Sequence, residues 1–202
     1  MTRPRRTLVP LVGALLATVV AVSGCTETEG TGDKGYVTGD GQINQVALEG
    51  RGDPVELTGE GLDGEPLDLA DLRGEVAVVN VWGAWCGPCR AEMPELVGAA
   101  EETADEAQFV GINIREDSQA TAQAFNRTFE VDYPSFWSPD GEALLAFTGT
   151  LGPRTIPATV VLDAEGRIAA SIIGPLPSQQ TLVDLVEEVA DESAPAGGST
   201  RG

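Results

Sequence analysis

The sequence predicts an α/β fold, with a central sheet flanked by helices. Short runs rich in β-branched residues alternate with longer segments that carry apolar residues at helical spacing. Strands that alternate with helices favour a layered arrangement of helices on a sheet. A chain of 202 residues, 42% of them hydrophobic, is long enough for one such domain plus tails.

The first predicted elements are short strands. Residues 55–58 and 66–69 are separated by a glycine-rich stretch over 59–64, which predicts a hairpin or a pair of short strands. Residues 71–74 form a turn. The next segment, Val76-Ala77-Val78-Val79-Asn80-Val81-Trp82, is apolar and β-branched, and we expect it to be the central strand.

Helices and strands then alternate. Residues 91–106 are expected to form a helix and residues 108–114 a strand. Residues 118–129 carry small or apolar residues at helical spacing behind Ser118, whose hydroxyl suits an N-cap. Residues 141–147 predict a shorter helix capped by Asp140.

The last elements are a strand pair and a helix. Residues 158–162 and 168–173 are expected to be strands joined by the turn over 163–166. Ser178 caps a final amphipathic helix. Its apolar face contains Leu182, Leu185, Val186 and Val189.

The N-terminus has the pattern of an export signal. Three arginines precede an apolar stretch over 8–22, which is shorter than the roughly 20 residues of a spanning helix. Val22-Ser23-Gly24-Cys25 resembles the lipobox of bacterial lipoproteins, which implies cleavage before Cys25 and lipidation of its sulfur. A retained N-terminal anchor is the alternative, and both place the domain on the extracytoplasmic face of the bacterial cell membrane.

These patterns divide the chain into four parts. We expect a signal peptide of the lipoprotein type at 1–24, a flexible tether at 25–42, one folded domain at 43–190 and a disordered tail at 191–202. The tether and tail are rich in small and polar residues, which have little apolar surface to bury.

The segment Trp85-Cys86-Gly87-Pro88-Cys89-Arg90 carries the chemistry, because it places two thiols within one helical turn after a strand. A zinc site would need about four ligands, but the chain has no histidine and only one other cysteine, Cys25. Haem attachment requires a histidine where Arg90 stands. A structural disulfide across so short a loop would stabilise little. The pattern therefore indicates a redox dithiol that needs no metal and no cofactor.

Composition excludes further classes. Without histidine, Ser-His and Cys-His catalysis is impossible. The formal net charge of −20 repels nucleic acid, so we expect no nucleic-acid partner.

The two cysteines are expected to have different roles. Cys86 stands at the start of a helix, where unpaired N–H groups and the helix dipole favour a thiolate. It is therefore the expected nucleophile, and the more shielded Cys89 is expected to resolve the mixed disulfide.

The sequence resembles the TlpA/ResA-like family of thioredoxin-fold, membrane-anchored extracytoplasmic thiol–disulfide oxidoreductases. The resemblance covers roughly residues 43–190 and rests on two motifs, over 80–94 and over 156–159. It implies a thioredoxin fold with a central mixed β-sheet, an N-terminal β-hairpin extension and an inserted strand–helix unit between Cys89 and Pro157.

The resemblance also implies site residues. Pro157 matches the cis-proline that faces the dithiol, and the backbone of Ile156 is then exposed for an extended substrate chain. Trp85, next to Cys86, is expected at the same substrate-binding surface. Asn80 stands where many thioredoxins have a buried aspartate, and Asn80 cannot take up a proton. In ResA-like proteins a glutamate at the position of Glu92 lies under the dithiol and tunes its protonation; the alternative for Glu92 is an exposed, ion-paired side chain.

Two enzymatic functions follow from the resemblance. The first is a reductase that receives electrons from a membrane thiol donor and reduces protein disulfides, such as the Cys-x-x-Cys-His of apocytochrome c during cytochrome c maturation. The second is an oxidase that donates its disulfide to secreted proteins as they fold. A third reading, a non-catalytic thioredoxin-like binding module, would fit a chain that had lost one of the two cysteines, and both are present.

Overall fold

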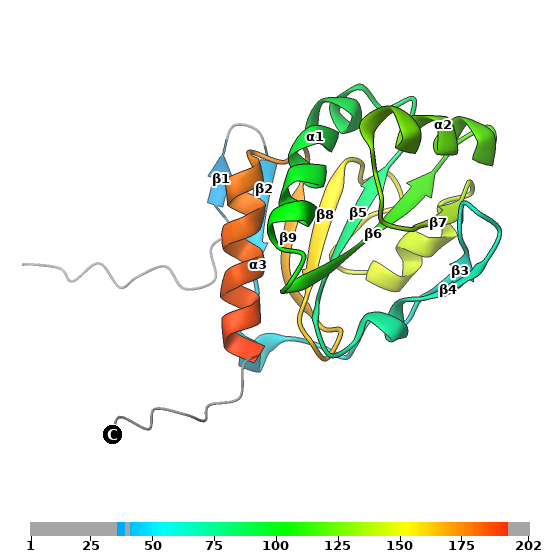
Figure 1. Ribbon diagram of the computed structural model, residues 1–202. Helices are drawn as coiled ribbons and strands as arrows, with labels where there is room; N and C mark the ends of the chain where they lie inside the picture. Colours follow the sequence, from blue (N-terminus) through cyan, green and yellow to red (C-terminus); the bar gives the residue numbers. More distant parts are fainter. Residues whose placement is uncertain (1–35, 39–40, 194–202) are drawn as a thin grey trace, which may run out of the picture. The chain divides into compact units, whose positions relative to one another are not determined.

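A computed structural model describes residues 36–38 and 41–193. In this part of the chain, seven strands form the main sheet in the order β1-β2-β9-β8-β5-β6-β7 (Figure 1). Their bounds are Tyr36–Thr38 for β1, Gly41–Gln45 for β2, Val76–Trp82 for β5, Ala107–Ile114 for β6, Ser135–Ser138 for β7, Ala158–Leu162 for β8 and Ile168–Ile173 for β9. A separate antiparallel pair contains β3 (Thr58–Glu60) and β4 (Pro66–Asp68).

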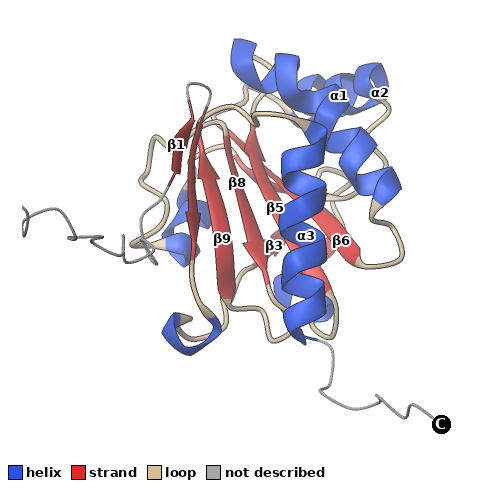
Figure 2. Cartoon of the chain, turned by 90° about the vertical axis from the view of Figure 1, so that its left-hand side faces the viewer, coloured by secondary structure: helices blue, strands red, loops and turns tan. Residues whose placement is uncertain are grey.

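Helices cover the sheet on both faces. The α-helices are α1 (Gly87–Glu102), α2 (Gln119–Phe129) and α3 (Gln179–Ser193), and the 3₁₀ segments are η1 (Leu48–Gly50), η2 (Leu69–Leu72) and η3 (Glu142–Phe147). Figure 2 shows α1 and α3 lying on the same face of the sheet. Their side chains share one core cluster with alternate residues of β5, while η2 and η3 pack with the other residues of β5 on the opposite face.

The pairing of β5 gathers distant parts of the chain at one edge of the sheet. Strand β5 runs parallel to β6, with Trp82 opposite Asn113, and antiparallel to β8, with Val81 opposite Ala158. The carboxyl ends of β5 and β6 and the start of β8 therefore meet. The segment Trp85–Arg90 leaves β5 at this edge.

Side-chain contacts fix α2 and β7 to the central strand. The Trp82 ring stacks on Phe125 of α2 with a centroid distance of 4.7 Å. Its indole N–H donates to the hydroxyl of Ser135 in β7 at 3.3 Å. A Cβ at Gly111 would lie 2.5 Å from the same indole nitrogen, so only glycine fits at that position of β6.

Most predicted elements are confirmed. The central strand and both strands of the C-terminal pair are present, and the hydroxyls of Ser118 and Ser178 accept backbone hydrogen bonds in the first turns of α2 and α3. The predicted hairpin is also present, but its first strand is Thr58–Glu60 and not 55–58. The mixed sheet flanked by helices confirms the predicted fold class. Between Cys89 and Pro157 the chain forms β6, α2, β7 and η3.

Several boundaries need correction. Residues 36–38 and 41–42 were assigned to the tether but form β1 and the start of β2, whose polar sequence gives no apolar alternation. Helix α1 begins at Gly87, four residues before the predicted start, because Cys86 takes the N-cap position. Strand β7 was not predicted, since four residues are too few to show a period. Helix α3 continues to Ser193, past the expected end of the domain.

The predicted signal peptide, Cys25 and the tail beyond residue 193 lie outside the described residues. Among the residues that are described, no helix combines the length and apolar character needed to cross a membrane.

A buried ion-pair network joins the turn between β8 and β9 to neighbouring segments. Asp163 is fully buried, and its carboxylate accepts hydrogen bonds from Arg51 at 3.2 Å and from the Arg167 side chain at 2.9 Å. Arg51 also pairs with Glu192 of α3. Burial alone would raise the pKa of Asp163, but hydrogen bonds from Arg167 and Arg51 outweigh it and hold that pKa below its usual range.

We expect Asp163→Ala to lower the free energy of unfolding by about 3–5 kcal/mol, because it removes the buried acceptor that Arg51 and Arg167 share and leaves Arg51 with Glu192 alone. Urea unfolding at pH 7 measures this loss. Asp105→Ala, which removes an exposed carboxylate from a loop, is the control and should change stability by less than about 0.5 kcal/mol. Equal losses in the two variants would show that the network contributes nothing specific.

Candidate active site

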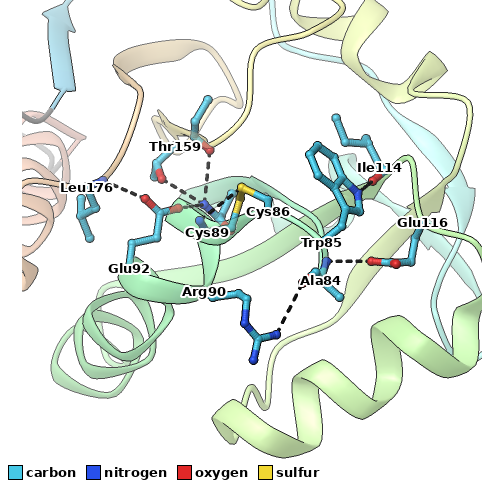
Figure 3. Close-up of a disulfide and its surroundings, with 12 residues drawn as sticks. Ala84, Trp85, Cys86, Cys89, Arg90, Glu92, Ile114, Glu116, Thr159 and Leu176 are labelled. Atoms are coloured by element: carbon cyan, nitrogen blue, oxygen red, sulfur yellow. Dashed lines mark hydrogen bonds between the residues drawn. A yellow bond between two sulfur atoms is a disulfide. The ribbon is translucent and has the colours of Figure 1, made fainter.

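Cys86 and Cys89 form a disulfide at the junction of β5 and α1 (Figure 3). Cys86 is the N-cap residue of α1, and its sulfur accepts a hydrogen bond from the backbone N–H of Cys89 at 3.2 Å. Pro88 fits the first turn, where its missing N–H leaves no bond unmade. Cys86 is 5% exposed and Cys89 is fully buried, so the first sulfur is the more accessible one.

The last residue of β6 and the residues that follow it hold the active-site loop. The Trp85 indole N–H donates to the carbonyl of Ile114 at 3.2 Å, and the backbone N–H of Ala84 donates to Glu116 at 2.7 Å (Figure 3). A Cβ at Gly83 would lie 2.6 Å from the Trp85 indole nitrogen, so glycine is required for this approach. The Trp85 ring is thereby fixed beside Cys86 while 49% of the residue stays exposed.

Ile156 and Pro157 lie at the same edge of the sheet. The peptide bond between them is cis, as predicted. Pro157 immediately precedes Ala158, which pairs with Val81 near the end of β5. The carbonyl of Pro157 accepts from Gly174, whereas the backbone N–H and carbonyl of Ile156 have no partner among the described residues.

Glu92 lies inside the protein, one helical turn after Cys89. It is 4% exposed, so the alternative of a surface glutamate is wrong. Its carboxylate accepts hydrogen bonds from the backbone N–H of Leu176 at 2.8 Å and from the Asn80 side chain at 3.3 Å (Figure 3). The Asn80 amide also donates to Ala158 and Thr159 of β8.

Burial controls the protonation of Glu92. Loss of hydration raises its pKa from 4.5 to about 7, although the hydrogen bonds from Leu176 and Asn80 act in the opposite direction. Burial likewise raises the pKa of Tyr133, and the charge of Glu92 raises it further. A carboxyl group with this pKa changes its protonation state near neutral pH.

The residues around the dithiol do not form a metal site. Within the described residues, no group of three or more histidine, cysteine, aspartate or glutamate side chains is arranged to hold a metal ion. Cys25 lies outside those residues.

Comparison with known proteins agrees with this geometry. Residues 49–188 match the family model described as Redoxin. The chain belongs to the Redoxin family. A solved structure titled as a secreted thiol-disulfide isomerase from Corynebacterium glutamicum superposes with a TM-score of 0.70 at 28% identity, and the match covers 79% of this chain and 99% of that one.

Two curated relatives indicate which group of the Redoxin family the chain resembles. The thiol:disulfide interchange protein HelX of Rhodobacter capsulatus is 35% identical over 133 residues, which are 65% of this chain and 71% of HelX. The thiol-disulfide oxidoreductase ResA of Bacillus subtilis is 27% identical over 116 residues, which are 57% of this chain and 62% of ResA. The resemblance to the TlpA/ResA-like group is confirmed, and the chain is a thiol–disulfide oxidoreductase with a thioredoxin fold.

The residues that hold the loop do not stand out in the sequence. Ile114 is only the last residue of a predicted strand, and Arg115 and Glu116 fall between two predicted elements. Parallel neighbouring strands end at the same edge of a sheet, so residues that follow the second strand could have been examined as partners of residues that follow the first.

We expect Glu92 to make stability fall as the pH rises. The pKa of Glu92 is about 7 in the native state and 4.5, the ordinary value for glutamate, in the unfolded chain. Between these pH values the native state binds more protons than the unfolded state, so the native state loses stability as the pH rises. From pH 5 to pH 8 the oxidised wild type should lose about 2–3 kcal/mol relative to Glu92→Gln in urea unfolding.

The matched control is Glu101→Gln, which removes an exposed carboxylate from the same helix. Its pH profile should run parallel to that of the wild type. If Glu92→Gln also runs parallel to the wild type, Glu92 does not titrate in the native state between pH 5 and pH 8.

Proposed function

We propose that this protein is an extracytoplasmic reductase of protein disulfides, with Cys86 as nucleophile and Cys89 as resolving thiol. The observation that carries the direction of electron flow is the buried carboxyl of Glu92 beside the dithiol. The family membership supports the reaction type, and the accessibility of Cys86 supports the assignment of roles.

The reaction proceeds in two exchanges. The Cys86 thiolate attacks a substrate disulfide, forms a mixed disulfide and releases one substrate thiolate. The Cys89 thiolate then attacks the Cys86 sulfur, which forms the Cys86–Cys89 disulfide and releases the second substrate thiolate. Two electrons pass to the substrate, and a membrane thiol donor returns two electrons to the protein.

The charge of Glu92 favours a reducing dithiol. A thiol–disulfide protein is a strong oxidant when its reduced, dithiol form is stabilised. An ionised carboxylate one turn from Cys89 disfavours a thiolate nearby, so it destabilises the reduced form. When Glu92 is protonated it can instead supply a proton to a leaving sulfur.

Trp85, Ile156 and Pro157 are the proposed substrate-binding residues. The free backbone groups of Ile156 can pair with an extended substrate chain in the manner of an added strand. The half-exposed Trp85, fixed by its bond to Ile114, offers an apolar surface next to Cys86 in the chain.

The proposed substrate is a protein disulfide outside the cytoplasm, such as the Cys-x-x-Cys-His of apocytochrome c. Support for export comes from the N-terminal pattern and from the secreted Corynebacterium relative. A lipid on Cys25 would hold the domain at the membrane, near a membrane thiol donor.

The alternative is an oxidase that donates its disulfide to secreted proteins. A relative titled as a secreted thiol-disulfide isomerase supports secreted proteins as the substrate class of this alternative, although isomerisation itself transfers no net electrons. The reduction potential separates the two functions, because a reductase needs a low potential and an oxidase a high one. For a two-electron couple, about 30 mV corresponds to 1.4 kcal/mol.

Cys89→Ala should accumulate mixed disulfides through Cys86, since the thiol that follows Cys86 in the active site and would resolve them is lost. Cys86→Ala, the matched control, should trap little, because Cys89 is buried. The measurement is mass spectrometry of adducts with a disulfide-bonded Cys-x-x-Cys-His peptide. Equal trapping by both variants would contradict the assignment of nucleophile and resolver.

The reduction potential should lie near the roughly −270 mV of thioredoxin and far below the roughly −120 mV of DsbA. Glu92→Gln should raise it by up to about 30 mV at pH 8, because the anion that opposes the thiolate is lost. Equilibration with thiol buffers of known potential gives both values, with Glu101→Gln as control. A wild-type potential near that of DsbA would favour the oxidase.

A further inference from the structure

A groove lies beside the disulfide, between the active-site loop and α2. Its volume is about 380 Å³, and it is lined by Trp85, Arg90, Glu116, Thr121, Phe125 and Thr128 among others. The groove adjoins the exposed part of the Trp85 ring. A polypeptide whose disulfide reaches Cys86 therefore has a second surface to contact.

Arg90 is held in this groove by aromatic rings. Its guanidinium lies 5.5 Å from the centre of the Phe125 ring and 5.4 Å from that of Phe129. One of its nitrogens donates to the carbonyl of Ala84 at 3.4 Å (Figure 3). A guanidinium has five N–H donors, and the other four have no hydrogen-bond partner among the described residues.

Arg115 presents a second guanidinium next to Trp85. Its guanidinium carbon lies 4.8 Å from the centre of the Trp85 ring. The residue is exposed, and its φ of 53° places it in the left-handed region, which turns the chain sharply at the end of β6. No hydrogen bond from its side chain reaches any residue of the described segments.

These two arginines differ from the arginines of the ion-pair networks. Arg51, Arg73 and Arg167 each pair with a carboxylate. Arg90 and Arg115 pair with none within residues 41–193, although the chain carries a net charge of −20.

Two carboxylates lie near these arginines. Glu116 is buried and accepts the N–H of Ala84, so that oxygen is occupied within the protein. Asp117 follows it in an exposed position. Both reduce the local positive potential, so direct hydrogen bonding by the guanidinium groups must supply the attraction.

We propose that Arg90 and Arg115 bind carboxylate side chains in the substrate segment that flanks the reacting disulfide. Arginine forms paired hydrogen bonds to carboxylates, and stacking on aromatic rings orients the guanidinium groups before binding. The inference rests on the proposed function in one respect, that the substrate is a protein disulfide. It deepens that function by assigning acidic flanking sequence as the preferred substrate.

The test uses disulfide peptides that share one Cys-x-x-Cys core and differ only in two flanking residues, which are Glu, Gln or Lys. The pre-reduced protein should reduce the Glu peptide about five- to tenfold faster than the Lys peptide at low salt. Arg90→Gln and Arg115→Gln should each lower this ratio about two- to fivefold. Salt at about 0.5 M should also lower the ratio in the wild type.

Arg127→Gln is the matched control, because Arg127 is an exposed arginine of α2 that does not line the groove and has no ion pair among the described residues. It should retain the wild-type ratio. A wild-type ratio near one, or equal ratios in the Arg90, Arg115 and Arg127 variants, would overturn the proposal. A protein that is not a reductase of protein disulfides would give a different result, because it would reduce none of the three peptides, including the uncharged Gln peptide.

Discussion

The burial of strand β5 is the constraint on which the site depends. All seven of its residues are buried, and it is hydrogen-bonded to β6 on one edge and to β8 on the other. Its carboxyl end therefore has one fixed position, and the chain must leave it at the sheet edge where β6 ends and β8 begins. Three segments distant in sequence meet at that edge: the loop with Trp85 and the dithiol after β5, the residues at the end of β6, and Pro157 before β8.

The same core that fixes the dithiol also contains an ionisable group. Glu92 projects from α1 into the cluster formed by α1, α3 and one face of β5, where water cannot compensate its charge. Two hydrogen bonds keep it in place, yet desolvation still dominates its pKa. Because its pKa is raised to about 7, the ionised form of Glu92 destabilises the native state. Carboxyl groups with such raised pKa values are typical of sites that move protons.

The segment between β6 and β8 gives this protein a second wall beside the sulfurs. Stacking of Trp82 on Phe125 and the bond from Trp82 to Ser135 tie α2 and β7 to the central strand. As a result, α2 lies next to the active-site loop and completes the groove that contains Arg90. The contacts that stabilise the insertion and the contacts that shape the substrate surface thus come from the same aromatic cluster.

Features that depend on local pattern can be predicted from the amino-acid sequence alone. The spacing of Cys86 and Cys89 within one helical turn, the apolar run of β5 and the motif around Pro157 each identify themselves within a few residues. Features that depend on long-range contacts become visible only in the folded chain. Glu92 meets Leu176 across 84 positions and Ala84 meets Glu116 across 32, and both contacts follow from sheet register and helix packing. Strands β1 and β2 could not be predicted for the same reason, since β2 pairs with β9, more than 120 positions away, and β1 pairs in turn with β2.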